Sequence, residues 1–435
     1  MTRTAVLALA AAAFGACRGS SAKVHRSGSA APVEMIAPPA AADAGAANTT
    51  DEVEPNDTAD VASPLPIGGR IRGKIEPETD VDRYRLDVAK PGVLQVSIAP
   101  VDADLVLEIE DASGTVLARS ARGGTRVVEG VPNLGVTPGR YTAVVRAAAK
   151  KKPATHHGRK PAAEPQKPAP VYELGAQLVT APPGAEHEPD DDRGTANDLL
   201  PGDTATGYVG WSGDQDFWKL SVEAVAAHNT LAFELAPVEG VELELEVQDA
   251  LGQALLVRKG ARGDGVTVSS FQPAIAQGAP PFVYVVVRAD RSNPETAYQL
   301  HVTPGVPGPD DELEPDDTPD HPFAIAPDRQ VVHAFWEYGD TDCFAVPVAA
   351  QPRGIDVSFD TPSELDLAAE LFIDGKSVAK VDHPGRGVQE KVGAPVAAGS
   401  HAVACVHAAS EGPGKKRIAY DVHVTESGAT GDDAP

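Results

Sequence analysis

Apolar and polar residues alternate along many short stretches of the chain after residue 50. The clearest are residues 104–111 and 242–249, which read Asp-Leu-Val-Leu-Glu-Ile-Glu-Asp and Glu-Leu-Glu-Leu-Glu-Val-Gln-Asp. A period of two is typical of a half-buried strand, because successive side chains point to opposite faces of a sheet. The chain also holds 41 Gly and 39 Pro residues, which favours frequent turns. These patterns predict an all-β protein of antiparallel sandwiches, with no amphipathic helix after the N-terminal leader.

Three parts of the chain repeat the same landmarks in the same order. Each begins with an acidic motif, Glu-x-Glu-Pro-Asn/Asp-Asp, at residues 52–57, 186–191 and 312–317. An Asp-x-Asp motif follows, and the second Glu precedes the second Asp by 28 residues in every copy: 54 to 82, 188 to 216 and 314 to 342. Each part closes with a strand led by a tyrosine, at Tyr172, Tyr298 and Tyr420. A chain of 435 residues corresponds to about three domains. We therefore expect three tandem β-sandwiches and a disordered tail, at 51–181, 185–305, 310–426 and 427–435.

The N-terminus has the features of an export signal. Arg3 precedes ten apolar residues at 5–14, and two small residues lie directly before Cys17. This arrangement predicts a signal peptide over 1–16. It also resembles the lipobox of bacterial lipoproteins, which implies that Cys17 becomes the lipidated first residue of the mature protein. The alternative is an ordinary signal peptide with a chance cysteine.

Residues 17–50 are rich in Ala, Ser, Gly and Pro and lack an apolar period, which predicts a disordered tether. We expect an exported protein whose membrane contact is the lipid anchor at Cys17. Its place would be the bacterial cell envelope, at the outer membrane or the cell surface rather than the inner membrane.

The order of these motifs resembles the bacterial pre-peptidase C-terminal domain family, which includes the collagen-binding domains of secreted clostridial collagenases. The resemblance rests on Glu-Pro-Asn-Asp-Thr, on Asp-x-Asp before an aromatic residue, on the alternating strand that ends in Asp-x-x-Gly, and on the closing Tyr strand. It covers nearly all of 52–425 as three copies. The resemblance implies jelly-roll β-sandwiches and calcium ligation by the acidic motifs.

The acidic motifs suit calcium on chemical grounds as well. In an extended segment, Glu-x-Glu-x-Asn/Asp places three oxygen-bearing side chains on one side. Calcium takes six to eight oxygen ligands, whereas the chain offers no Cys/His set suited to zinc. The alternative is a solvated acidic linker in front of each domain. Carried over from the family, the calcium ligands would be Glu52, Glu54, Asn56 and Asp57 with Asp80 or Asp82; Glu186, Glu188, Asp190 and Asp191 with Asp214 or Asp216; and Glu312, Glu314, Asp316 and Asp317 with Asp340 or Asp342.

Some of these residues also have a purely structural interpretation. Each Asp-x-Asp lies at a turn before a strand, where Asp can bond its own backbone. The alternate residues that follow then face the core, as Tyr84/Leu86, Trp218/Leu220 and Phe344/Val346. We expect the closing tyrosines to serve packing rather than ligand contacts.

Charge and motifs limit the possible functions. The chain has 37 Lys and Arg against 63 Asp and Glu, a net charge of −26, which argues against nucleic acid as a partner. No metalloprotease, nucleophile-elbow or phosphate-loop motif is present, so we expect a non-enzymatic, monomeric adhesion, binding or spacer module. The alternatives are a calcium-independent module for polysaccharide or fibrous protein, and an undetected secreted hydrolase. A basic loop at 147–170 could contact anionic lipid or polysaccharide, or could simply be solvated.

Two cysteines lie in the third repeat. Cys343 follows its Asp-x-Asp motif, and Cys405 lies on the penultimate strand. In an oxidising compartment they could form a disulfide. The alternative is a pair of buried thiols.

Overall fold

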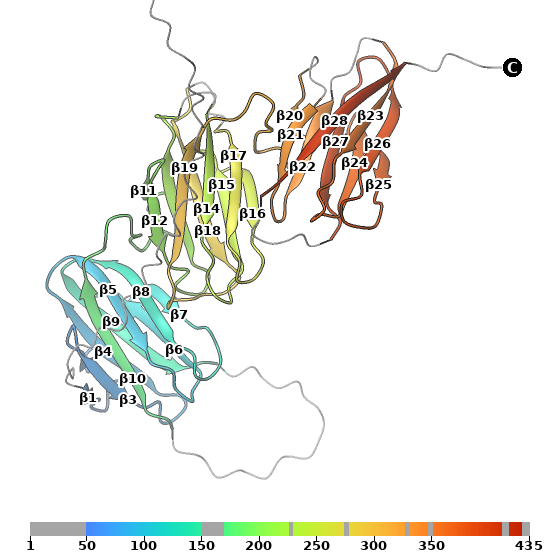
Figure 1. The fold of residues 1–435 in the computed structure, drawn as a ribbon. Helices are drawn as coiled ribbons and strands as arrows, with labels where there is room; N and C mark the ends of the chain where they lie inside the picture. Colours follow the sequence, from blue (N-terminus) through green and yellow to red (C-terminus); the bar gives the residue numbers. More distant parts are fainter. Residues whose placement is uncertain are drawn as a thin grey trace, which may run out of the picture. The chain divides into compact units, whose positions relative to one another are not determined.

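We describe the fold from a computed structural model (Figure 1). It describes residues 49–149, 169–225, 229–273, 278–326, 331–346, 351–410 and 417–428. These residues form strands, turns and bends with no helix, so the all-β prediction is confirmed. It follows that none of them belongs to a helix of the length and hydrophobicity that crossing a bilayer requires.

The first pair of sheets, called sandwich 1, has the strand orders β1-β3-β10-β5-β8 and β2-β4-β9-β6-β7. The short strands β1 and β2 pair in parallel with β3 and β4, and the other pairings are antiparallel. The strands are β1 (Thr49–Asp51), β2 (Ser63–Pro64), β3 (Arg70–Gly73), β4 (Val81–Val88), β5 (Gly92–Ile98), β6 (Leu105–Glu110), β7 (Val116–Ser120), β8 (Glu129–Val136), β9 (Gly139–Ala147) and β10 (Tyr172–Val179).

Sandwich 2 repeats this topology with the orders β11-β13-β18-β15-β16 and β12-β19-β14-β17. Its strands are β11 (Asn197–Leu199), β12 (Thr204–Gly207), β13 (Gln215–Ser221), β14 (Thr230–Leu235), β15 (Leu243–Gln248), β16 (Ala254–Lys259), β17 (Val266–Phe271), β18 (Phe282–Ala289) and β19 (Tyr298–Gly305).

Sandwich 3 has the orders β20-β22-β27-β24-β25 and β21-β28-β23-β26. Its strands are β20 (Phe323–Ala324), β21 (Val331–Trp336), β22 (Thr341–Val346), β23 (Arg353–Phe359), β24 (Leu367–Ile373), β25 (Lys376–Val381), β26 (Glu390–Val396), β27 (Ala402–Ala408) and β28 (Ile418–Gly428). The two alternating sequences, 104–111 and 242–249, form β6 and β15, and the Tyr-led sequences form β10, β19 and β28.

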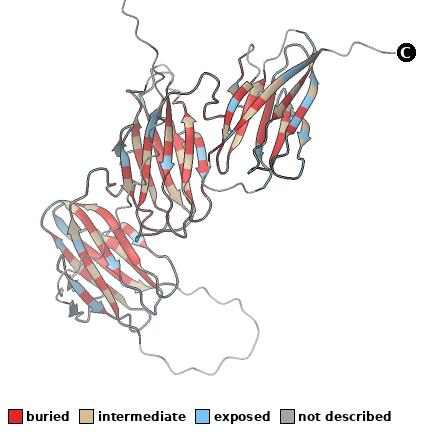
Figure 2. Ribbon diagram, in the orientation of Figure 1, coloured by how far each residue is buried: buried red, intermediate tan, exposed pale blue. Residues whose placement is uncertain are grey.

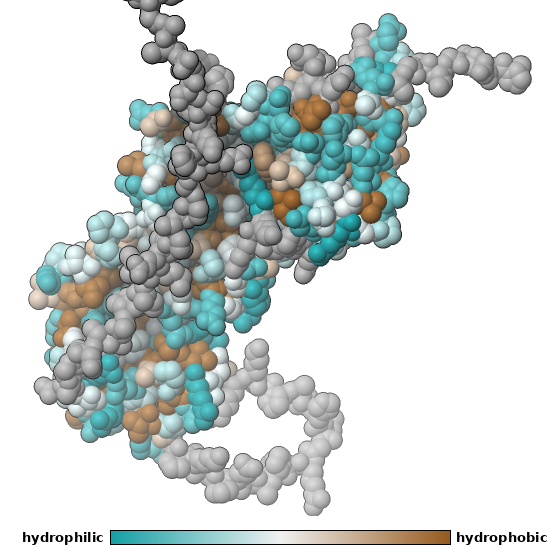
Figure 3. Space-filling model, in the orientation of Figure 1, coloured by the Kyte–Doolittle hydropathy of each residue, from teal (hydrophilic) through white to brown (hydrophobic). Residues whose placement is uncertain are grey.

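Each sandwich has its own hydrophobic core between its two sheets. Buried and exposed residues alternate along the strands (Figure 2). The six residues expected to face the cores after the Asp-x-Asp motifs are all buried. On the face shown in Figure 3, apolar side chains are scattered among polar ones.

Several predicted features fall outside the described residues. These are the leader with Cys17, the tether up to residue 48, most of the basic loop at 147–170, and the tail after residue 428. The boundaries of the three domains stay predictions. The three cores lie within them except for Trp211, which packs in the core of sandwich 1.

Candidate metal centres

The acidic motifs run as extended segments that bury every second side chain. In the second copy Glu186, Glu188 and Asp190 are buried, while His187 and Pro189 between them are exposed. The third copy buries Glu312, Glu314 and Asp316 in the same way. In the first copy only Asn56 is buried, Glu52 is half-buried and Glu54 is exposed. In copies two and three, the three oxygen-bearing side chains therefore share one side of the extended segment, and that side faces the protein interior.

Each motif brings its first and fifth residues toward the second Asp of the Asp-x-Asp motif. We call these three residues the inner set of each acidic cluster. The inner sets are Glu52, Asn56 and Asp82; Glu186, Asp190 and Asp216; and Glu312, Asp316 and Asp342. The second Asp is the second residue of β4, β13 or β22 and is buried in all three copies.

The closing tyrosines reach the inner sets, which the sequence did not reveal. Tyr172 donates a hydrogen bond to Asp82, and Tyr420 donates one to Asp342. Tyr298 donates to Glu186 Oε2 at 3.1 Å while accepting a hydrogen bond from Trp218 Nε1 at 3.0 Å. The expectation that these tyrosines serve packing alone is therefore incomplete: they line the cores and also hydrogen-bond to the carboxylates.

The remaining predicted residues form an outer set in each cluster. These sets are Glu54, Asp57 and Asp80; Glu188, Asp191 and Asp214; and Glu314, Asp317 and Asp340. In copy two, repulsion from Glu188 and Asp191 adds to burial in raising the pKa of Asp214 well above its usual value. In copy three, carboxylate oxygens of Glu314, Asp340 and Asp342 lie within 4.8 Å of one another.

The second cluster buries five carboxyl groups without a counter-charge. Glu186, Glu188, Asp190, Asp214 and Asp216 are all at most 6% exposed. Across the described ranges of the chain, none of them forms an ion pair with a basic side chain. Burial and neighbouring carboxylates raise the pKa of Glu188 to about 9. They also hold the pKa of Asp216 well above its usual value.

Several buried oxygens of the second cluster have no hydrogen-bond partner. Both carboxylate oxygens of Asp216 are in this state, as are one oxygen each of Glu188, Asp190 and Asp214. Buried polar atoms are nearly always paired in native proteins. Repelling, unpaired oxygens gathered within a few ångströms are the donor set that calcium prefers. We conclude that these residues fit a calcium ion.

Sandwich 1 contributes a side-chain amide to this cluster. Asn133 on β8 donates its Nδ2 to Glu186, and its buried Oδ1 has no partner. Two backbone hydrogen bonds join the same segments: Gly135 N donates to Glu188 O at 2.7 Å, and Glu188 N donates to Asn133 O at 3.4 Å. We call this set of contacts joint 1–2.

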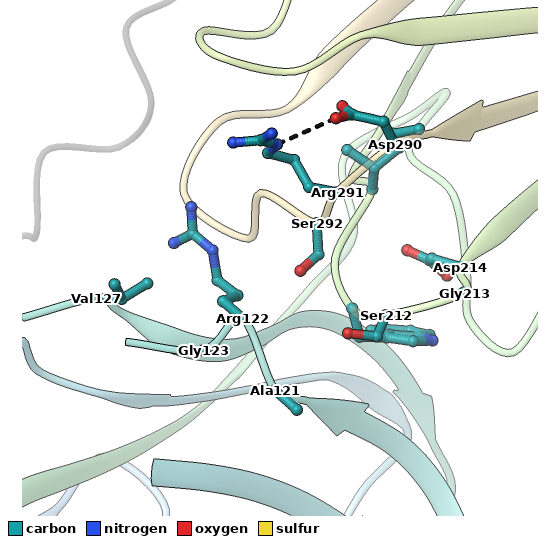
Figure 4. A pocket seen from close by; sticks show the side chains of 13 residues that line it. Ala121, Arg122, Gly123, Val127, Ser212, Gly213, Asp214, Asp290, Arg291 and Ser292 are labelled. Atoms are coloured by element: carbon teal, nitrogen blue, oxygen red, sulfur yellow. Dashed lines mark hydrogen bonds and ion pairs between the residues drawn. The ribbon is translucent and has the colours of Figure 1, made fainter. Parts of the chain in front are cut away.

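Asp214 also lines a pocket, together with Ser212, Gly213 and Arg122 (Figure 4). Two arginines on its wall are paired elsewhere: Arg122 bonds Glu295 at 2.9 Å and Arg291 bonds Asp290 at 3.2 Å. Neither ion pair neutralises Asp214.

The first cluster is more open. Asp80 accepts backbone hydrogen bonds from Glu76 at 2.9 Å and Val81 at 3.1 Å, as expected for a turn, and Asp57 is exposed. One oxygen each of Glu52, Glu54 and Asp82 nevertheless lie within 4.8 Å of one another. Burial raises the pKa of Asp82 to about 8, with the charge of Glu52 adding to the shift. This set also fits a cation, with fewer buried oxygens than the second.

The third cluster contains a cation of its own. Arg258 on β16 of sandwich 2 bonds all three residues of the outer set: Glu314 at 2.7 Å, and also Asp317 and Asp340. Its side chain is 1% exposed. Burial lowers the pKa of the guanidinium, but the carboxylates outweigh it and raise that pKa well above the usual value. No sequence motif marks Arg258, so its role is visible only in the folded structure.

The contact between sandwiches 2 and 3 repeats the pair of backbone hydrogen bonds found in joint 1–2. Gln272 N donates to Glu314 O at 2.8 Å, and Glu314 N donates to Ser270 O at 3.1 Å. We call this set joint 2–3. Ser270 thus occupies the place that Asn133 has in joint 1–2.

Cys343 and Cys405 are joined by a disulfide in the structure. They face each other across the neighbouring strands β22 and β27. Both are buried beside Val403, outside the main core of sandwich 3. The bond therefore ties the strand that carries Asp342 to its neighbour.

No protein-family model matches the chain, and no curated protein matches it. Among solved structures, the chain is similar to the pre-peptidase C-terminal domain of collagenase from Bacillus anthracis, at 15% identity over 29% of this chain and 100% of that chain, with a TM-score of 0.20. It is similar to the CBM22-1–CBM22-2 tandem domain of Paenibacillus barcinonensis Xyn10C, at 11% identity over 48% and 82%, with a TM-score of 0.15. It is also similar to the human MASP-1/3 CUB1-EGF-CUB2 domain, at 8% identity over 55% and 99%, with a TM-score of 0.16.

Proposed function

We propose that the chain is a non-catalytic binding or spacer module of the bacterial cell envelope, stabilised by calcium at its acidic clusters. The single observation that carries the proposal is the second cluster, in which five buried carboxyl groups lack a counter-charge among the described residues. Calcium would neutralise that repulsion with oxygen ligands already gathered for it. In this proposal Cys17 carries the lipid anchor, and the tether separates the sandwiches from the membrane.

A structural role for the ions is favoured by their surroundings. The acidic cluster recurs in all three sandwiches, and in each a buried tyrosine from the closing strand bonds it. A catalytic pair of carboxylates needs access for substrate, whereas the inner carboxylates of clusters two and three are almost fully buried. The partner would be a polysaccharide or an extracellular protein bound by the sandwich faces.

Thermal unfolding tests the calcium part of the proposal. The protein without residues 1–17 is melted in EDTA, then with increasing calcium, and with magnesium for comparison. A ligand that binds only the folded state adds about 2.7 kcal/mol at a hundredfold excess over its dissociation constant. We expect a calcium-specific rise in the melting temperature, and Asp216→Asn should reduce it.

Asp198→Asn is the matched control, because Asp198 is exposed on β11 of the same sandwich. It should keep the full calcium response. An unchanged melting temperature at millimolar calcium would overturn the proposed role of the ion. The binding part needs a separate test, in which the protein is mixed with cell-envelope polysaccharide or collagen and sedimented.

A further inference from the structure

The strand that carries Arg258 has an equivalent in sandwich 1. β7 pairs with β6 so that Ser120 lies opposite Leu107, and β16 pairs with β15 so that Arg258 lies opposite Leu245. Leu107 and Leu245 occupy the same place in the two alternating sequences, 104–111 and 242–249. Ser120 and Arg258 are therefore equivalent positions at the ends of sandwiches 1 and 2.

The two residues have different partners. Ser120 bonds Glu129 of its own sandwich at 2.6 Å and makes no contact with the second cluster. Arg258 leaves its sandwich and bonds the outer set of the third cluster. Two of its three carboxylate partners, Glu314 and Asp340, belong to the three residues whose oxygens converge there within 4.8 Å. A divalent ion held by this outer set would have to displace the guanidinium.

The matching outer set in sandwich 2 holds no such group. Glu188 and Asp214 each have a buried oxygen without a partner. Charge repulsion that Arg258 offsets in the third cluster is unopposed here, because the described residues supply no basic side chain to it. The two clusters are alike in their acids and differ in the cation.

We infer that the guanidinium of Arg258 replaces a calcium ion in the outer set of the third cluster, so that joint 2–3 holds without calcium while joint 1–2 requires it. The inference rests on the proposed calcium function, and it differs from the three predicted calcium sites in giving the outer set of the third cluster to Arg258. Removal of calcium should therefore affect only one joint: it releases sandwich 1 from sandwich 2 and leaves sandwiches 2 and 3 joined.

Calcium counting tests the replacement. Bound calcium per chain is measured by equilibrium dialysis for the wild type and for Arg258→Ser, which installs the residue that sandwich 1 has at this position. We expect Arg258→Ser to bind one more calcium ion than the wild type. Arg262→Ser is the matched control, because Arg262 pairs with Asp290 of its own sandwich at 2.8 Å and is half-exposed. It should bind the wild-type number.

The outcomes separate the two ideas. Calcium binding by the wild type without a gain in Arg258→Ser overturns this inference alone. An absence of calcium binding in both proteins overturns the inference together with the proposed calcium function.

Hydrogen exchange on the wild-type protein gives a test that does not depend on a variant folding. The amides of Gly135 and Gln272 make the same backbone bond in the two joints. We expect EDTA to speed exchange at Gly135 at least tenfold and to leave Gln272 unchanged. Equal acceleration at both amides would overturn the inference.

Discussion

Joint 1–2 and joint 2–3 are built on the same backbone bonds and surrounded by different side chains. In joint 1–2, the side chain of Asn133 bonds Glu186, and Trp211 of sandwich 2 belongs to the hydrophobic core cluster of sandwich 1. In joint 2–3, Arg258 bonds Glu314 directly. Glu337 accepts hydrogen bonds there from the backbone and side chain of Ser269. At joint 1–2 the described residues therefore bring no positive charge to the acidic cluster, whereas at joint 2–3 Arg258 partly neutralises it.

The difference shows that the acidic motif alone does not determine what a cluster binds. Equivalent acidic residues meet the amide of Asn133 at one joint and the guanidinium of Arg258 at the other. A buried carboxylate needs a partner because an uncompensated charge is costly away from water. The residue that the preceding sandwich presents decides whether that partner is part of the chain or a dissolved ion.

The largest effect on the comparison should come from Trp211→Ala. Trp211 is 6% exposed and packs in the core cluster of sandwich 1, and truncation of a buried large aromatic residue costs about 3–5 kcal/mol. We expect a loss of this size in the free energy of unfolding measured in urea, concentrated on sandwich 1. Leu251→Ala is the control in sandwich 2, because its side chain is 84% exposed. A loss below about 1 kcal/mol would show that joint 1–2 does not depend on this packing.

The second prediction uses two matched substitutions that should change the free energy of unfolding in opposite directions. In EDTA at pH 8, Glu314→Gln removes a charged partner of Arg258 and should lower the free energy of unfolding by about 1.5–3 kcal/mol. Glu188→Gln removes a buried carboxyl whose pKa is raised to about 9. A raised pKa costs stability above the pKa of the unfolded state, so this substitution should raise the free energy of unfolding, by on the order of 1 kcal/mol. Urea unfolding of both variants beside the wild type provides the measurement.

Calcium should reverse the second of these results. With excess calcium, Glu188→Gln loses an ion ligand and should become less stable than the wild type. Effects of the same sign for the two variants in EDTA would contradict the view that the joints differ in their cation.

The fold was predictable from the sequence because it depends on local periodicity. Alternation at 104–111 and 242–249 predicted β6 and β15, and the alternation within the acidic motifs predicted which of their side chains share a face. The constant spacing from the second Glu to the second Asp predicted that these residues gather, and oxygens of Glu188 and Asp216 lie within 4.8 Å of one another. These features lie within one repeat, where the pattern of side chains along a strand determines burial.

The parts of the site that the sequence did not reveal come from contacts between distant residues. Arg258 lies 56 residues before Glu314, and its sequence neighbours resemble an ordinary edge strand. Asn133 lies 53 residues before Glu186 and has no motif. Tyr298 was predicted to be buried, but only the packed structure shows that its hydroxyl meets Glu186. A comparison of β7 with β16 exposes the Ser120–Arg258 difference, but not the cluster that the arginine enters.

The smallest predicted effect comes from Asn133→Ser, which gives joint 1–2 the residue that joint 2–3 has at Ser270. The substitution removes the Nδ2 donor to Glu186 and the unpartnered Oδ1, while the backbone bonds to Glu188 stay. Loss of one such contact is worth about 1 kcal/mol, so calorimetric titration should find calcium affinity about fivefold weaker. Gln177→Ser is the control, because Gln177 is an exposed amide on β10 of the same sandwich. Unchanged affinity in Asn133→Ser would confine the ion to the residues of sandwich 2. A fivefold loss would make sandwich 1 part of the calcium site, and calcium binding would then stabilise joint 1–2 directly.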